Sequence, residues 1–344
     1  MKKEIWGFAP PPTGGISVYC KRLIDKLHAK DEHIIMRNFA ASKSGCGYIV
    51  DVKNKLIEFL KLLFVSKRLI HSQFTNFKLL LLLYLFGWRH DIIMTLHNRR
   101  LVILNGWKRW IVNRLFQRVK CVIYNDPTYT SLLRGKFDLD EAKILILPTY
   151  IPPCKDELRG LTEDITDFLS RHTYSLSANA SRIIKNETFG DLYGLDQLIY
   201  LMDRLVHEKG LDVGMVFCIS DIFNHEYYNH CIAKIKELGL ERHFLFAIAP
   251  SVNGFEVWSA TDVFLRPTMS DMEGVSVKEA LQFGTPVVAS DVCTRPKEAV
   301  LYRTGDAEDL FDKTYTLLLG KLRVSYTPEV CVEDEILRIY SSLS

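Results

Sequence analysis

The strongest constraint on the fold is an alternation of short apolar runs with longer helical patterns that extends along most of the chain. In the first half, apolar runs with the length and composition of buried strands lie at residues 4–8, 33–39, 68–74, 91–97, 121–125 and 142–148. Stretches with helical spacing lie between them, near 17–30, 53–66, 76–87, 105–118 and 127–135. This alternation predicts an α/β fold, a parallel sheet with helices on its faces.

The same alternation restarts after a proline-containing connection at residues 151–172. Apolar runs lie at 174–180, 213–219, 243–248, 262–268 and 285–290, with helical stretches near 193–208, 225–238, 253–259 and 275–283. We therefore expect two parallel sheets in series. The predicted boundaries are a first domain at 1–150, a linker at 151–172, a second domain at 173–328 and a terminal helix at 329–344.

The charge is unevenly divided between the two halves. Residues 1–150 contain 25 Lys and Arg against 11 Asp and Glu, whereas residues 151–344 contain 19 against 30. Such a basic half favours an anionic partner. The candidate partners are nucleic acid, a membrane surface and a phosphorylated ligand. No nucleic-acid-binding motif accompanies the charge, so we do not expect nucleic acid as a partner.

Cysteine spacing and hydropathy indicate the compartment. The eight cysteines are scattered without a C-x-x-C pair, which argues against a disulfide framework and a thiolate zinc site and favours the reducing cytoplasm. The N-terminus reads MKKEIWGFAPPPTGG, which is not the pattern of a signal peptide. The longest apolar run, residues 79–88, has about half the length of a membrane-spanning helix. We expect a cytoplasmic protein.

Two glycines stand at the first strand-to-helix turn. Gly14 and Gly15 follow a proline run and precede the helix expected at 17–30. Glycines here allow backbone N–H groups to approach a phosphate, or they serve a tight turn, and the pattern does not separate these possibilities. The absence of G-x-G-x-x-G argues against a nicotinamide cofactor.

The most informative segment is residues 262–291, DVFLRPTMSDMEGVSVKEALQFGTPVVASD. A polar loop with Asp271 and Glu273 follows the strand, and a helix carrying Glu279 begins after it. Amides of a helix start bind anions, and the carboxylates can accept hydrogen bonds from sugar or ribose hydroxyls. The segment therefore predicts a sugar-nucleotide site, with backbone contacts from Gly274, Val275 and Ser276.

The end of this segment resembles the retaining family-four glycosyltransferases of the GT-B fold, whose hallmark is a Glu-x7-Glu motif. KEALQFGTPVVASD matches the family at Glu279, Ala280, Gly284, Thr285, Pro286 and Asp291. The first acid of the motif falls on Asp271, with Glu273 as a nearby alternative. The pattern is most similar to bacterial enzymes of surface-polysaccharide assembly, such as O-antigen, capsule or exopolysaccharide enzymes.

The resemblance covers most of the chain and implies a fold and an activity. PPTGGISVYCKRL, MTLHN, SANASRI and DLYGLDQLI are similar to further family segments. The implied fold has two Rossmann-like domains facing across a cleft, with a terminal helix that crosses back to the first domain. The implied activity is retaining transfer of a hexose from a UDP- or GDP-sugar, without a cofactor, to a lipid-linked saccharide. By resemblance, Glu279 holds the ribose, Asp271 or Glu273 the donor sugar, and His97 lies beside that sugar.

The chain departs from the family in its second domain. The family places an arginine after the first strand and a lysine before a glycine, and both hold the diphosphate. Here Tyr193 precedes Gly194, so Arg182 and Lys185 are the candidates to supply the charge, although a solvated loop explains them equally well. The departures at Tyr193 and Asp271 leave open a second class of function, a non-catalytic subunit that binds sugar nucleotide or lipid.

No group of residues has metal-ligand spacing beside the donor segment. Asp138 and Asp140 lie in a charged turn, and His225 and His230 are five residues apart, which splays them on a helix. We expect no metal, so helix N-termini and basic side chains must stabilise the leaving diphosphate. His97 ends an apolar strand, and the alternative for it is a buried histidine of the core.

A basic helix near 105–118 suggests a membrane-facing surface. Trp107, Trp110, Arg114 and Arg118 gather on the side opposite its apolar face. Aromatic rings beside cations suit the headgroup layer of an anionic bilayer. The alternative is a solvated basic face whose tryptophans the 53–66 helix covers. We expect peripheral association with the inner face of the cell membrane.

Overall fold

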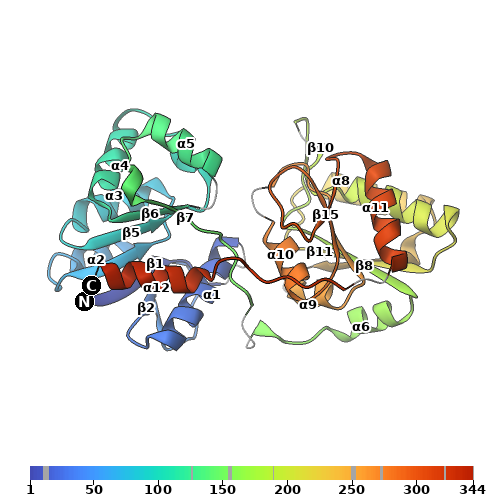
Figure 1. Ribbon diagram of the computed structural model, residues 1–344, viewed down its shortest axis with the longest axis horizontal. Helices are drawn as coiled ribbons and strands as arrows, with labels where there is room; N and C mark the ends of the chain where they lie inside the picture. The colour runs from blue at the N-terminus through green and yellow to red at the C-terminus, as the bar shows by residue number, and fades with distance from the viewer. Residues whose placement is uncertain are drawn as a thin grey trace. The chain divides into compact units, whose positions relative to one another are not determined.

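The computed structural model describes residues 1–10, 15–124, 127–153, 157–188, 190–248, 253–271, 274–320 and 323–343. The chain forms two compact units, Met1–Ile151 together with Pro328–Ser344, and Pro152–Thr327. Each unit is a parallel sheet covered by helices on both faces (Figure 1).

The sheet of the first unit has, in the described residues, seven parallel strands in the order β3-β2-β1-β4-β5-β6-β7. The strands are β1 (Lys2–Gly7), β2 (Ile35–Asn38), β3 (Ile49–Asp51), β4 (Arg68–Ser72), β5 (Asp91–Thr95), β6 (Cys121–Tyr124) and β7 (Ile144–Ile146). Winding outward from β1 in both directions is the doubly wound order of nucleotide-binding sheets.

Alternation along these strands places successive side chains on opposite faces. Ile5 packs with α1 (Gly15–Lys30) and α12 (Val332–Ser342), while Trp6 packs with the layer on the other face. That layer contains α2 (Lys55–Lys61), α3 (Phe77–Phe86), α4 (Gly106–Arg118) and α5 (Pro127–Lys136). Both faces of the sheet are buried, which explains why its strands read as continuous apolar runs.

The terminal helix α12 belongs to the first unit, as the family resemblance implies. Its Tyr340 is 1% exposed, and the hydroxyl lies 2.7 Å from Nδ1 of His71 on β4. Asp334 forms an ion pair with Lys30 of α1. The helix therefore completes the first core although more than 170 residues of the other unit precede it.

The sheet of the second unit has six parallel strands within the described ranges, in the order β12-β11-β8-β13-β14-β15. The strands are β8 (Tyr174–Ala180), β11 (Val213–Ile219), β12 (Phe244–Ile248), β13 (Val263–Arg266), β14 (Val287–Ser290) and β15 (Val300–Tyr302). A small hairpin joins β9 (Lys185–Asn186) to β10 (Gly190–Asp191).

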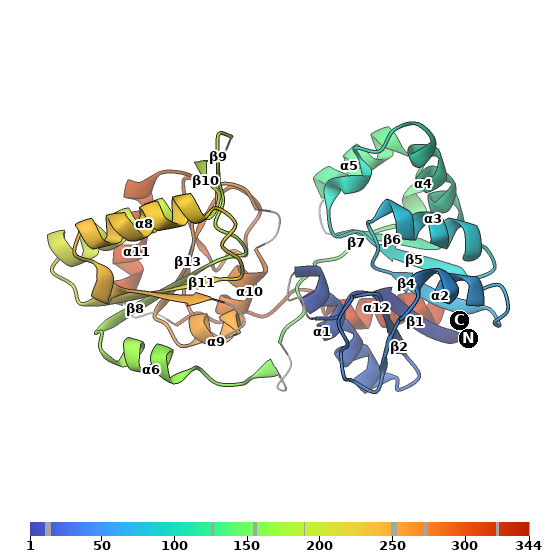
Figure 2. The ribbon, with the colours of Figure 1, turned by 180° about the vertical axis from the view of Figure 1, so that it is seen from behind.

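Helices cover both faces of this sheet as well. One face packs against α7 (Leu195–Asp203, continued by a wider turn at Arg204–Glu208), α8 (His225–Glu237) and α11 (Ala307–Gly320). The other face packs against α6 (Glu163–Ser170), α9 (Gly254–Ser259) and α10 (Val275–Gln282). Figure 2 shows α8 and α6 on opposite sides of the sheet. Short 3-10 turns lie at Arg99–Leu101, Glu141–Lys143 and Glu241–His243.

The predicted architecture of two parallel sheets is confirmed. The sequence pattern does not predict β3 and β15, which have three residues each. The strand β7 is equally short but lies within the longer apolar run at 142–148, which reveals it. The segment 151–172, expected to be a linker, contains α6, whose Ile165 and Phe168 pack on the second sheet. Among the described residues, no helix combines the length and apolar character that crossing a membrane requires.

Candidate functional site

Charged and polar side chains gather at the carboxyl edge of the second sheet. The neighbouring strands β8 and β13 end there, and Nη1 of Arg266 donates a 2.9 Å hydrogen bond to Oδ1 of Asn179. Ligands of open α/β sheets bind outside the carboxyl ends of the strands. This edge is therefore the candidate donor site of the second unit.

Asp271 lies between two guanidinium groups at this edge. Its Oδ2 is 3.1 Å from Nε of Arg266 and 2.9 Å from Nη1 of Arg295. Burial alone would raise the pKa of this carboxyl, but the charges and hydrogen bonds of the two arginines outweigh burial and lower the pKa to about 2. Asp271 is therefore ionised at neutral pH and acts as the shared counter-ion of both arginines.

Arg295 belongs to this cluster, although the sequence does not reveal it. Its side chain has no exposed surface, and its Nε donates to the carbonyl of Ser290 at 3.3 Å. Nη2 donates to the Thr268 hydroxyl at 3.4 Å. All three of its nitrogen atoms are thus engaged. Neither periodicity nor spacing connects Arg295 with an aspartate 24 residues earlier, so only tertiary contacts could identify it.

The helix α10 begins directly beside these groups. Gly274, its N-cap, has a φ of 63°, and a Cβ there would lie 2.0 Å from Nη1 of Arg295. A glycine is therefore required both by the backbone conformation and by the close approach. No side chain of the described residues caps this helix start, and the predicted backbone contacts Val275 and Ser276 form its first turn.

Glu279 lies on the same helix and is 6% exposed. Ser276, in the first turn of the helix, is buried as well. Glu273 of the preceding loop, the alternative first acid, lies outside the described residues, as does Gly14 of the first unit.

Tyr193, which stands where the family has a lysine, contacts the same edge. The guanidinium of Arg266 lies 5.3 Å from the centroid of its ring, and its hydroxyl is hydrogen-bonded to Ser181. Gly194 begins α7 with a φ of 69°, and a Cβ there would lie 2.4 Å from the carbonyl oxygen of Pro267. The start of α7 therefore packs tightly against the loop that follows β13.

The two basic residues that the sequence offers in place of the lysine have partners elsewhere. Nε of Arg182 lies 3.4 Å from Oδ2 of Asp221, and the Arg182 side chain is 57% exposed. Nζ of Lys185 lies 4.7 Å from the ring centroid of Tyr227 and borders a cavity of about 390 Å³ formed by α7 and α8. Within the part of the chain that the structure describes, no hydrogen bond or ion pair joins either residue to Asp271.

In the first unit, His97 lies at the carboxyl edge of the sheet, just after β5. Its Nε2 donates a 2.7 Å hydrogen bond to Oε1 of Gln73, and its ring packs edge-on against Tyr19 of α1 at 5.0 Å. Burial lowers the pKa of His97 to about 4, so its ring is neutral at pH 7. Gly15 begins the same helix α1, and a Cβ there would have open space around it. Packing therefore does not explain a glycine at position 15.

The tryptophans of α4 remain exposed. Trp107 and Trp110 are 60% and 52% exposed, and their ring contacts are with Phe77 and Tyr84 of α3, not with α2. The guanidinium of Arg114 lies 5.5 Å from the Trp110 ring, and that of Arg118 lies 4.4 Å from the Tyr84 ring. The structure thus brings all four predicted membrane-facing residues onto one surface with α3.

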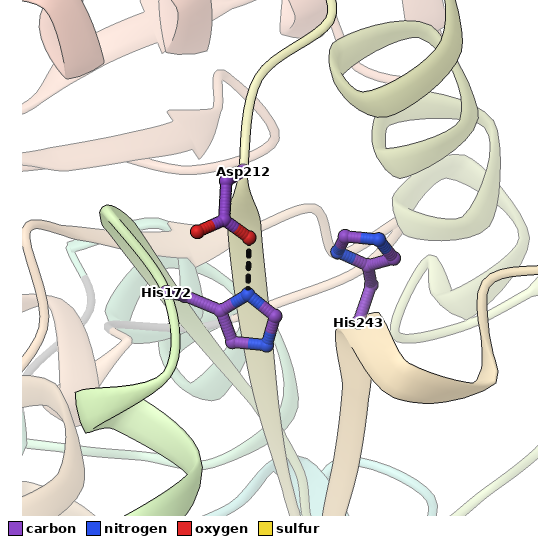
Figure 3. A group of neighbouring side chains, drawn as sticks. All are labelled: His172, Asp212 and His243. Atoms are coloured by element: carbon purple, nitrogen blue, oxygen red, sulfur yellow. Dashed lines mark hydrogen bonds and ion pairs between the residues drawn. The ribbon is translucent and has the colours of Figure 1, made fainter.

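A separate group that could hold a metal ion lies at the amino edge of the second sheet (Figure 3). The possible ligand atoms of His172, Asp212 and His243 lie within 4.8 Å of one another. Nδ1 of His172 is 2.7 Å from Asp212, and Nδ1 of His243 is 2.7 Å from the Val213 carbonyl. The remaining ring nitrogens contact Arg242. Because every ring nitrogen has a partner, the group already links the starts of three strands.

Comparison with known proteins agrees with this geometry. Residues 179–308, which contain the edge described above, match the model of a family described as glycosyl transferases group 1. No curated protein matches the sequence.

Solved structures of similar fold extend over nearly the whole chain. HepE of Anabaena, solved in complex with UDP, is 14% identical over 99% of this chain and 100% of that chain, with a TM-score of 0.70. A trehalose-phosphate synthase from Burkholderia xenovorans is 11% identical over 94% of both chains, with a TM-score of 0.67. WaaG, a glycosyltransferase involved in lipopolysaccharide biosynthesis, is 14% identical over 92% of this chain and 90% of that chain, with a TM-score of 0.62. The GT-B fold is thereby confirmed, and the match over the second unit supports a glycosyltransferase.

Proposed function

We propose that this chain is a retaining glycosyltransferase that moves a hexose from a UDP- or GDP-sugar to a lipid-linked saccharide in cell-surface polysaccharide synthesis. The observation that carries the proposal is the coincidence of two features in the second unit. Residues 179–308 match a glycosyltransferase family, and the same residues place buried guanidinium groups and a helix start at the carboxyl edge of the sheet.

The proposed chemistry needs positive charge at this edge. When the bond between the anomeric carbon and the diphosphate breaks, negative charge builds on the leaving phosphate oxygen. Preorganised N–H donors stabilise such charge without a metal ion. The first-turn amides of α10, from Gly274 to Ser276, would face the diphosphate, and Glu279 would hold the ribose. The assignment of Glu273 to the donor sugar rests on the sequence alone.

The neutral imidazole of His97 suits a hydrogen-bonding role toward a sugar hydroxyl. Its Nε2–H is given to Gln73, which leaves Nδ1 as the acceptor of the ring. A charged imidazolium would instead repel an oxocarbenium-like centre. We therefore assign His97 to the transferred sugar.

The structures of HepE with UDP and with UDP-glucose favour UDP-linked donors as the first to test. A panel of UDP- and GDP-sugars is added to the protein, and thermal unfolding and transfer of labelled sugar to lipid-linked acceptors are measured. The true donor raises the melting temperature by mass action and supports transfer. If a donor stabilises the protein but is neither transferred nor hydrolysed, the chain is the alternative, a non-catalytic subunit that binds sugar nucleotide. If no donor stabilises the protein, the proposal is refuted.

The membrane part of the proposal rests on exposed apolar side chains of the α2–α4 layer. Besides Trp107 and Trp110, large apolar residues are exposed on these helices or within a few residues of their ends: Leu56, Ile57, Leu60, Phe64, Leu85, Trp88 and Ile103. Adjoining exposed apolar side chains mark interaction surfaces. No acidic residue lies between Asp91 and Asp126, so the charge around α4 complements an anionic bilayer.

Vesicle co-sedimentation tests this surface. We expect the protein to bind vesicles that contain anionic lipid, to bind neutral vesicles weakly, and to dissociate as salt rises. Replacing Trp107, Trp110, Arg114 and Arg118 by alanine should release it while donor stabilisation persists. The matched control replaces Arg171 and Lys236, exposed cations of the other unit. Unchanged vesicle binding of the fourfold variant would exclude α4 as the docking surface.

A further inference from the structure

The two arginines around Asp271 differ in how their donors are used. Arg295 is fully engaged, because each of its three nitrogens donates to a protein oxygen and its side chain is completely buried. Arg266 uses Nε for Asp271 and Nη1 for Asn179, but its Nη2 donates no hydrogen bond among the described residues. Arg266 therefore has one nitrogen, with two N–H donors, that no described protein group uses.

Arg266 is mostly buried, but its unpaired donor is not sealed off from solvent. The residue is 8% exposed, and Nη2 is not one of the fully buried side-chain atoms that lack a hydrogen-bond partner. A ligand that accepts from Nη2 would replace water on a guanidinium whose other donors are already fixed by protein oxygens, so this donor is held in place before the ligand binds. In the ion pairs of the described residues, Arg266 and Arg295 share one carboxylate, that of Asp271. The cluster thus has more donors than the described protein acceptors satisfy.

Two helix starts lie beside Arg266. Its guanidinium stacks near Tyr193, and the next residue, Gly194, begins α7. On the other side, Asp271 leads to Gly274, which begins α10. Helix N-termini carry partial positive charge. The start of α7 already has an anion of its own, because the Asp191 carboxylate accepts hydrogen bonds from the backbone N–H groups of Tyr193 and Asp196. No described side chain caps the start of α10, so this second helix start favours a further anion. A neutral sugar hydroxyl would not need this much positive charge, whereas a diphosphate would.

We propose that Arg266 binds a phosphate of the donor diphosphate through Nη2, replacing the lysine that Tyr193 displaces, and that Asp271 holds Arg266 in position. The proposal rests on the proposed function and names the residues of that site. In the reaction, the anomeric carbon gains a bond to the acceptor oxygen, and the pair of electrons of the broken bond goes to the leaving phosphate oxygen, which takes up the acceptor proton. Arg266 stabilises that leaving group, and Asp271 is a positioning residue.

The first test is the affinity of Arg266→Gln for UDP and GDP, measured by calorimetry beside the free nucleosides uridine and guanosine. Loss of one charged hydrogen bond predicts about 10- to 100-fold weaker binding of the diphosphate that the wild type binds. Nucleoside binding should not change, because it involves no phosphate. Arg171→Gln is the matched control, because Arg171 is exposed and precedes β8 at the amino edge of the same sheet. Diphosphate affinity within twofold of the wild type in Arg266→Gln would overturn the proposal.

The second test separates a positioning role for Asp271 from contact with the sugar. If Asp271 orients Arg266, Asp271→Asn weakens UDP alone and UDP-sugar by similar factors, and the loss appears in the donor KM more than in kcat. If Asp271 contacts the sugar, only UDP-sugar binding weakens and UDP is unaffected. That second result would overturn the positioning role.

Folding does not obstruct these tests. In Arg266→Gln, Asp271 keeps its 2.9 Å ion pair with Arg295, so no buried charge is left alone. Should the single variant unfold, the double variant Arg266→Gln with Asp271→Asn removes both charges together and is judged by the same twofold limit. A wild-type protein that binds no nucleoside diphosphate would refute the proposed function itself, which distinguishes that failure from failure of Arg266.

Discussion

Replacing Gly274 by alanine tests the packing of the donor edge most directly. The residue has a φ of 63°, and the added Cβ would lie 2.0 Å from Nη1 of Arg295. That guanidinium cannot move aside freely, because it is held by Asp271, Ser290 and Thr268 in a fully buried position. The substitution therefore combines backbone strain with displacement of a buried charge.

The magnitude follows from these two contributions. A non-glycine residue in the left-handed region costs about 1–2 kcal/mol, and losing a hydrogen bond to a charged group costs about 1.5–3 kcal/mol. Gly274→Ala should therefore destabilise the second unit by about 2.5–5 kcal/mol. Gly284, at the other end of α10, is the matched control. Its φ is 82°, but a Cβ there would meet only the Val324 carbonyl at 3.4 Å, an ordinary contact. Gly284→Ala should cost the strain alone.

Hydrogen exchange of the full-length protein in dilute denaturant measures the second unit separately. Amides of β13 and α10 report its opening free energy, while amides of β4 and β5 report the first unit, which should be unchanged. The reasoning is refuted if Gly274→Ala and Gly284→Ala lower the stability of the second unit equally. Donor binding should also be lost in Gly274→Ala and retained in Gly284→Ala.

Four further outcomes are expected. Glu279→Gln should lower kcat/KM by about 100-fold or more with a melting temperature close to that of the wild type; full activity would exclude the ribose role. His97→Ala should lose turnover without unfolding, whereas loss of the fold would support a core histidine. Transfer should survive EDTA, and strict dependence on manganese or magnesium would contradict the proposed mechanism. Burial, with a smaller contribution from His97, lowers the pKa of His71 to about 3. The unfolded chain therefore binds more protons between pH 6.5 and 3, and the stability of the first unit falls through that window as the pH drops. His71 alone contributes up to about 1.4 kcal/mol per pH unit to this fall, and His97, whose pKa is lowered to about 4, adds to it. A denaturation midpoint that is constant from pH 6.5 to 4.5 would contradict this.

Local sequence determines the layers of this protein. Strands that are buried on both faces are apolar throughout, and the apolar residues of an amphipathic helix recur about every 3.6 residues. Both patterns can therefore be recognised without a structure. The donor segment is legible for the same reason. Asp271, Gly274 and Glu279 lie within nine residues of one another, between the end of β13 and the second turn of α10, so their closeness in the sequence keeps them close in space.

Other features follow from contacts between distant segments. In the sequence, Arg266 is recognisable only as the end of a strand, and nothing marks Arg295 as a site residue. Their role depends on sharing the carboxylate of Asp271, which Arg295 reaches from the loop between β14 and β15. Similarly, the partners of Arg182 and Lys185 are Asp221 and the Tyr227 ring, which no spacing rule connects to them.

The terminal helix shows the same division. Its amphipathic pattern predicts a helix, whereas its attachment at Tyr340 to His71 joins residues 269 positions apart. Periodicity reports only which side of an element is buried, since it reflects neighbours within a few residues along the chain. The order of the strands in each sheet decides which distant segments come together. That order therefore determines which charges form ion pairs, which donors remain unpaired and which core the terminal helix completes. Only the tertiary structure of each unit decided them.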